Sequence, residues 1–100
     1  MLINRWQATE IPKKEQLKLI LHNEGIEFEE EFLTSHTQIP EHRHPFNEIR
    51  VVVDGELLFN VGGTQLLLRA GDRIEIAANT KHWHQPQNGD VLTLFGRKFF

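Results

Sequence analysis

Four residues of this chain stand out as possible metal ligands by their type and spacing, namely His42, His44, Glu48 and His82. Side chains alternate between the two faces of an extended strand, so residues 42, 44 and 48 share parity and could share a face, although Pro45 can bend the chain between His44 and Glu48. Imidazole nitrogens with one carboxylate suit Fe, Mn, Ni, Co, Cu or Zn, whereas Ca and Mg prefer oxygen shells. Histidines two residues apart also occur on exposed strands, so the alternative is a set of strand histidines without a metal.

Two further residues could assist chemistry at such a site. Arg50 has the parity of Glu48, and an inward arginine is costly unless it is paired. It is either an anion clamp for a substrate carboxylate or enolate, or an ion-pair partner of an acidic neighbour, unless a bulge turns it outward. His84 has the parity of His82 and is either a general acid or base near the metal or a rim residue.

The remaining histidines are expected to lie outside the chemistry. His36 shares parity with His42 and could form a hydrogen bond to a metal-ligating side chain, but we expect it to face solvent. His22 falls in the last turn of a predicted helix, where the helix dipole favours a cation. We expect no catalytic role for His22.

These residues need strands to position them, and the chain predicts mostly strands after one helix. The helix begins near Pro12 and ends near Glu24, before Gly25, with a buried face of Leu17, Ile20 and Leu21. A weaker strand is predicted over 2–6. Many short strands separated by turns predict an all-β sandwich or barrel, and the predicted strands cover residues 48–53, 57–61, 65–68, 73–77, 83–85 and 91–95.

Turn signals and alternating patterns refine this prediction. Asp54-Gly55 predicts a turn that ends one strand. Between residues 27 and 32, the phenylalanines fall on one face and the glutamates Glu27, Glu29 and Glu31 on the other. We interpret this acidic run as a solvated strand face.

Composition limits the class of protein. The chain has 100 residues, 39% of them hydrophobic and 25% charged, which predicts one globular domain, with an N-terminal extension over 1–25 and a β-barrel over 26–100. The absence of cysteine excludes disulfides and cysteine-based zinc sites. With a net charge of −3, the chain lacks the excess of basic residues that is typical of nucleic-acid-binding proteins. No apolar run approaches the ~20 residues that are needed to span a bilayer. The N-terminus does not read as a signal peptide, so a cytoplasmic protein is expected.

The wider spacing resembles the two-motif pattern of the cupin superfamily. His42-Arg43-His44, Glu48 and Gly55 match the first motif, and Gly71-Asp72 with His82 match the second. The resemblance implies a small jelly-roll β-barrel that holds one divalent transition metal ion (Fe, Mn, Ni or Zn) on His42, His44, Glu48 and His82. It also implies a homodimer. Asn79 stands where the family has a glycine, a mild change because asparagine tolerates left-handed backbone.

The resemblance leaves several functions open. The first is a metal-dependent dioxygenase or isomerase that acts on a small oxygenated metabolite, with Arg50 and His84 as helpers and open metal positions for the substrate. The alternative is a non-catalytic small-molecule sensor or binding module. A third is an acireductone-dioxygenase-like activity. It is suggested because segments 48–50, 53–56, 71–72 and 82–83 resemble the corresponding segments of acireductone dioxygenases. An open pocket with Arg50 and His84 facing the metal would favour an enzyme. The C-terminal Phe99-Phe100 pair could pack against a second subunit.

Overall fold

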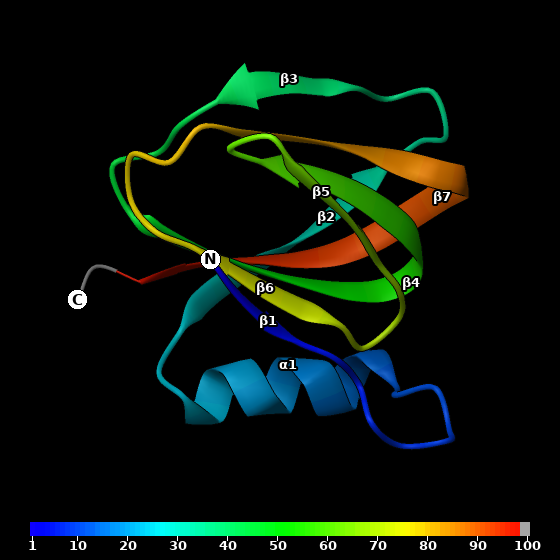
Figure 1. The fold of residues 1–100 in the computed structure, drawn as a ribbon. Coiled ribbons are helices and arrows are strands. Elements are labelled where there is room, and N and C mark those ends of the chain that lie inside the picture. Colours follow the sequence, from blue (N-terminus) through cyan, green and yellow to red (C-terminus); the bar gives the residue numbers. More distant parts are fainter. Residues whose placement is uncertain (99–100) are drawn as a thin grey trace.

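Two long strands, β4 (Asn47–Val61) and β7 (His82–Lys98), run antiparallel along most of their length and form the frame of the fold (Figure 1). The computed structural model describes residues 1–98, so the expectation about Phe99-Phe100 lies outside the described residues. Within 1–98 there are seven strands and one helix, in agreement with the predicted all-β barrel with an N-terminal helix.

The frame is bent into two halves, each widened by shorter strands. Around 47–54 of β4 and 91–98 of β7, the sheet is extended by β6 (Arg73–Ile76), then β1 (Leu2–Asn4), and on the other side by β2 (Glu27–Leu33). Around 56–61 and 82–87, it is extended by β5 (Thr64–Leu68) and β3 (Ile39–His42). The halves face each other, so both contribute side chains to one interior.

The turn predicted at Asp54-Gly55 is wrong, because β4 continues through it as an irregularity in the pairing with β7. Gly55 has φ +92°, and a Cβ atom there would lie 2.5 Å from the Asp90 carbonyl oxygen. The glycine therefore allows one strand to bend between the halves without ending. The predicted strands over 83–85 and 91–95 likewise merge into β7, where Asn88 and Gly89 have positive φ.

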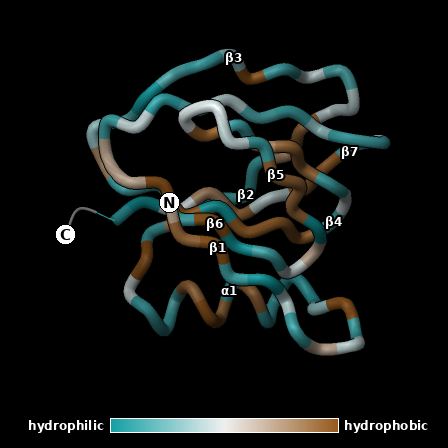
Figure 2. Tube along the Cα trace, in the orientation of Figure 1, coloured by the Kyte–Doolittle hydropathy of each residue, from teal (hydrophilic) through white to brown (hydrophobic). Residues whose placement is uncertain are grey.

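Apolar residues form two clusters, one on each face of the first half-sheet. The inner cluster contains residues of both halves, such as Val52 and Phe59, and the outer cluster includes Leu17 and Leu21 of helix α1 (Lys14–Asn23). Figure 1 shows this helix alongside the sheet. This explains the uninterrupted apolar run at 51–53, because both faces of β4 are covered. Leu17 and Leu21 are buried as predicted, but Ile20 is 43% exposed, so the helix packs on a narrower stripe. Figure 2 shows hydrophobic stretches in the central strands, whereas β3 is mostly hydrophilic.

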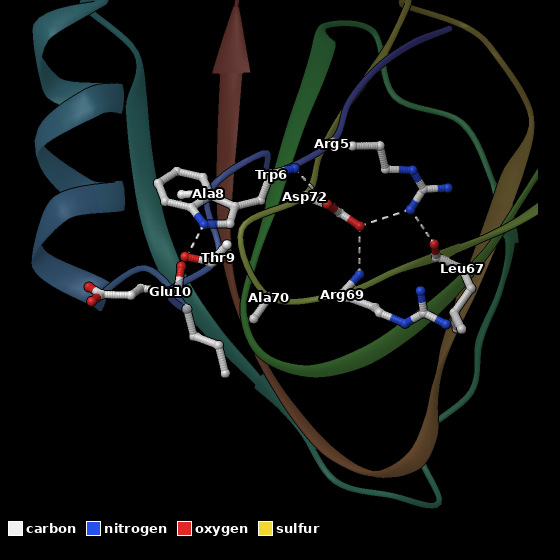
Figure 3. A pocket seen from close by; sticks show the side chains of 10 residues that line it. Arg5, Trp6, Ala8, Thr9, Glu10, Leu67, Arg69, Ala70 and Asp72 are labelled. Carbon is white, nitrogen blue, oxygen red and sulfur yellow. Dashed lines mark hydrogen bonds and ion pairs between the residues drawn. The ribbon is translucent and has the colours of Figure 1, made fainter.

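The segment before the helix is fastened by one carboxylate. Asp72 accepts hydrogen bonds from the Trp6 amide at 2.9 Å, the Arg69 amide at 3.0 Å and Arg5 Nη1 at 2.8 Å (Figure 3). The Trp6 side chain then packs over Gly71, where a Cβ atom would lie 2.6 Å from the indole ring. The Gly71-Asp72 pair thus ties the N-terminal extension to the barrel. No helix of the part described, 1–98, is long and apolar enough to cross a membrane.

Candidate metal centre

The four predicted ligands come together from three strands and one loop. His42 ends β3, His44 follows in the loop, Glu48 lies near the start of β4, and His82 begins β7. One ligand atom from each residue lies within 4.8 Å of the others. Glu48 Oε1 is 3.1 Å from His82 Nε2 and 3.3 Å from His44 Nε2. The centre is therefore assembled from residues of both barrel halves.

Backbone carbonyls orient two of the imidazole rings. His42 Nδ1 is 2.8 Å from the Pro40 carbonyl oxygen, and His82 Nδ1 is 2.8 Å from the Thr80 carbonyl oxygen. Because a carbonyl only accepts hydrogen bonds, we assign the proton of each neutral ring to Nδ1. This leaves the Nε2 lone pairs for a metal, as is usual for histidine ligands with a supporting acceptor.

The loop that carries His44 is fastened to the turn before His82. The Asn79 amide donates to the His44 carbonyl oxygen at 2.7 Å, and the Ala78 amide donates to Asn47 Oδ1 at 2.9 Å. Asn79 has φ +62°, the left-handed backbone expected where the family has glycine. The turn therefore positions ligands on both sides of the centre.

Charges in the centre are strongly coupled. Glu48 is 1% exposed, and although burial opposes its ionisation, His82 and Arg50 lower the pKa of the carboxyl to about 2. Burial lowers the pKa of His44. Burial also opposes protonation of His82, but its hydrogen bonds to Glu48 and to the Thr80 carbonyl raise the pKa of this ring. Glu48 is therefore a carboxylate at neutral pH, the form that binds metals.

Arg50 is buried and already paired, which favours the ion-pair interpretation of this residue. Its Nε donates to Glu48 Oε2 at 3.2 Å, and its Nη1 donates to Glu31 Oε1 at 2.7 Å and Thr93 Oγ1 at 3.0 Å. The guanidinium also lies over the Phe95 ring, 4.5 Å from the centroid. Within the described chain its Nη2 makes no hydrogen bond, so one donor group remains for a ligand.

His84 lies in the interior rather than at the rim. Its side chain is 2% exposed, its ring stacks on Phe59 at 4.8 Å, and neither ring nitrogen has a hydrogen-bond partner among residues 1–98. Its ring centroid is 6.1 Å from that of His42. A buried polar group without a partner costs about 1–3 kcal/mol, so such a group calls for a functional explanation.

Glu31 is the residue that the sequence interpretation missed. It was assigned to a solvated face, but its carboxylate contacts buried Arg50, and its side chain is 35% exposed. Two positions along β2, Leu33 belongs to the inner core cluster, so strand alternation places Glu31 inside as well. That parity with Leu33 was the available signal. On the opposite face Phe32 is 62% exposed.

The other two histidines lie where they were expected. His36 and His22 are both exposed, and neither belongs to the cluster of candidate ligands. They serve as natural controls for the residues of the centre.

The residues fit a divalent transition metal. Bonds of about 2.1 Å to imidazole nitrogen or carboxylate oxygen place adjacent ligand atoms about 3.0 Å apart and opposed ones about 4.2 Å apart. The contacts of 3.1 and 3.3 Å at Glu48 Oε1 match the adjacent spacing. The 4.8 Å within which all four ligand atoms lie exceeds the opposed spacing by about 0.6 Å, so the side chains would have to move closer together by that amount around an ion. The donor set, with nitrogen in the majority, suits Fe, Mn, Ni or Zn rather than Ca or Mg.

A pocket of about 430 Å³ adjoins the centre. Two of the ligand rings form part of its wall, together with both predicted helper residues. Its lining comprises Glu31, Ile39, Pro40, His42, His44, Arg50, His84 and Phe95. Arg50 and His84 therefore line the same pocket as two of the candidate ligands, and their roles in chemistry stay a prediction. A second cavity, of about 640 Å³, lies between the N-terminal segment and Asp72 (Figure 3).

Comparison with known proteins agrees with this geometry. The model of the cupin domain family matches residues 28–94, which include all four candidate ligands. The chain belongs to the cupin family. The barrel is thus a cupin jelly roll, as the resemblance of the two motifs implied.

Individual proteins match different shares of the chain. An acireductone dioxygenase of Alcanivorax borkumensis is 38% identical over 66 residues, which cover 62% of this chain and 33% of that protein. The chain thus spans about a third of the length of this curated relative. A cupin protein from Bacteroides fragilis has a TM-score of 0.63 at 23% identity, over 72% of this chain and 64% of that one. A Neisseria meningitidis protein has a TM-score of 0.61 at 19% identity, over 95% and 87% respectively.

Proposed function

We propose that this cupin binds one divalent transition metal ion, Fe, Mn, Ni or Zn, and is a metal-dependent enzyme of dioxygenase or isomerase type. Its substrate would be a small oxygenated metabolite. One observation carries the proposal: four ligand atoms lie within 4.8 Å of one another beside a pocket of about 430 Å³. A bound ion would supply Lewis-acid polarisation of substrate oxygens.

The protein's own residues would position the substrate. Arg50 orients Glu48 through Oε2, which leaves Oε1 directed at His44 and His82. Its unpaired Nη2 is the donor we assign to a substrate oxygen. His84 lies on the pocket wall and is our candidate for proton transfer.

An acireductone-dioxygenase-like activity is the second candidate. It is supported by the 38% identity over 66 residues to such an enzyme, although the chain spans only a third of it. A non-catalytic binding or sensor role is the remaining alternative. In that case metal and ligand would bind without turnover.

The test is metal analysis followed by an oxygen-uptake and product screen. Purified protein reconstituted with each of Fe²⁺, Mn²⁺, Ni²⁺ and Zn²⁺ is expected to hold close to one equivalent, and His44→Ala less than a tenth of an equivalent. His36→Ala is the matched control, since it removes an exposed imidazole outside the cluster. A wild-type content below a tenth of an equivalent contradicts the proposal. One equivalent without turnover of any enediol, 2-hydroxy acid or 2-oxo acid favours the binding role.

A homodimer and a cytoplasmic location belong to the same proposal. Support for the dimer comes from exposed apolar side chains on opposite edge strands, Leu2 at 55% on β1 and Phe32 at 62% on β2. Light scattering measures the mass directly, and a mass of one chain at micromolar concentration would exclude the dimer. The location rests on the sequence expectation alone.

A further inference from the structure

The pocket beside the metal centre contains a carboxylate that is not a candidate ligand, and it bears on which molecules can enter. Glu31 projects from β2, a strand that contributes none of the four ligands, and it lines the same pocket as His42 and His44. Its Oε1 is held by Arg50 Nη1 at 2.7 Å. Its Oε2 makes no hydrogen bond with any residue described, and the side chain is 35% exposed. One acceptor oxygen is therefore fixed in place and available.

The charges around the pocket leave room for one anionic group. Glu48 and Glu31 oppose the single positive charge of Arg50, so the three side chains together carry one negative charge. His84, whose ring nitrogen is 3.9 Å away, and Arg50 lower the pKa of Glu31 to about 2, although partial burial opposes its ionisation. With a divalent ion bound, the ion and these three side chains together carry one positive charge. A ligand with one anionic head on the metal neutralises it, whereas a second carboxylate would bring the total to one negative charge and would lie near the carboxylate of Glu31.

We propose that Glu31 determines specificity in this pocket: it selects ligands that carry one anionic metal-binding head and present a hydroxyl or ammonium donor to Oε2, and it rejects dicarboxylates. This inference rests on the proposed metal-dependent function and adds the charge class of the ligand. The His84 ring, whose nitrogens make no hydrogen bond within residues 1–98, lies beside the same carboxylate. A donor group that binds Glu31 would therefore lie near other polar side chains of the pocket, Arg50 and His84.

Three small acids of similar size test the proposal. Lactate, glycerate and tartronate share a 2-hydroxy-carboxylate head that chelates a metal, and their third group is a methyl, a hydroxymethyl and a carboxylate respectively. Their dissociation constants are measured on Co²⁺-loaded protein from the change in visible absorption, with no turnover required. In the wild type we expect glycerate to bind more tightly than lactate, and lactate more tightly than tartronate.

The decisive comparison uses Glu31→Gln with Glu29→Gln as its control. Glu29 lies on the same strand and parity, but its side chain is 64% exposed and pairs with Arg97 away from this pocket. In Glu31→Gln, tartronate should bind about tenfold more tightly relative to lactate, and the preference for glycerate should fall about fivefold. In Glu29→Gln both ratios should stay within twofold of the wild type. Ratios in Glu31→Gln within twofold of the wild type would overturn the proposal.

Measurements of folding and of metal content distinguish a failure of this inference from a failure of the proposed metal-dependent function. Circular dichroism and Co²⁺ stoichiometry are recorded for each variant. If Glu31→Gln does not fold, Glu31→Asp replaces it, because it withdraws the carboxylate by one methylene. The glycerate preference should then fall at least threefold, and no change would overturn the proposal. A wild type that binds no Co²⁺ would defeat the metal centre and this inference together, whereas Co²⁺ and acid binding with unmoved ratios would defeat the inference alone.

Discussion

Arg50 Nε donates a hydrogen bond to Glu48 Oε2 across 3.2 Å, between two side chains that are 2% and 1% exposed. The other Glu48 oxygen, Oε1, faces His44 and His82. One carboxylate thus joins the metal centre to a buried cation. This relationship makes Arg50 a structural element of the centre as well as a wall of the pocket.

Removal of the Arg50 charge should destabilise the protein strongly. Arg50→Gln leaves Glu48 and Glu31 without their shared cation, and breaking a buried ion pair costs about 3–5 kcal/mol. Urea denaturation of the metal-free protein measures this loss. Arg97→Gln is the control, since Arg97 and its partner Glu29 are 44% and 64% exposed, and the loss there should be below about 1 kcal/mol. Equal losses in the two variants would show that the Arg50 network is not required for stability.

The bend in β4 should depend on the absence of a side chain at Gly55. Gly55→Ala would place a Cβ atom 2.5 Å from the Asp90 carbonyl oxygen, in addition to the cost of φ +92°. Gly63 has φ +91°, but a Cβ atom at this position would have no other atom within 4 Å. Gly63→Ala therefore has only the backbone cost of about 1–2 kcal/mol. We expect Gly55→Ala to lose at least about 2 kcal/mol more in chemical denaturation. Similar losses would mean that β7 moves aside freely at Asp90.

Asp72 should make the stability of the protein sensitive to acid. Burial opposes ionisation, but the amides of Arg69 and Trp6 and the Arg5 guanidinium lower the pKa of Asp72 below its ordinary value of 3.8. A lowered folded-state pKa adds stability that is complete above the unfolded value and lost as pH falls through the folded one. Asp72→Asn should therefore cost about 2 kcal/mol at pH 6 and progressively less below pH of about 4.

The control for Asp72 is an exposed aspartate. Asp54→Asn removes the same charge from an exposed position and should change stability by less than about 0.5 kcal/mol at pH 6. Urea denaturation at pH 6, 4 and 3 provides the comparison. A difference between wild type and Asp72→Asn that is constant over this range would contradict the proposed linkage.

Metal binding should stabilise the folded chain. A ligand that binds only the native state adds about 2.7 kcal/mol at a hundredfold excess over its dissociation constant. Zn²⁺ should therefore raise the melting temperature of the wild type and of His36→Ala by several degrees, but not that of His44→Ala or Glu48→Gln. Differential scanning calorimetry with and without EDTA measures the shift. A rise of the same size in His44→Ala would place the ion elsewhere.

The candidate ligands were predictable because their chemistry and spacing lie in short segments. Residues 42, 44 and 48 lie close together along the chain, and the second motif supplies His82. The helix and the barrel class followed from periodicity, which depends only on local residue order. Leu17 and Leu21 are buried accordingly.

Other features depend on segments that are distant in the chain. Asp54-Gly55 resembles a hairpin turn locally, but the register of β7 makes it a bend within one strand. Ile20 follows the helical pattern, yet the surface that α1 covers is too narrow to bury it.

The sequence by itself indicated the family through the resemblance of its motifs, and it pointed to the four candidate ligands and the kind of metal they would suit, since residue type and spacing are local features. Only the tertiary structure decided the role of Glu31. An acidic strand face is solvated unless a cation lies opposite, and Arg50 meets Glu31 only because β2 and β4 both pair with β7. Whether a charge is exposed or paired inside a barrel depends on which strands are neighbours, and this information is not local to any segment of the chain.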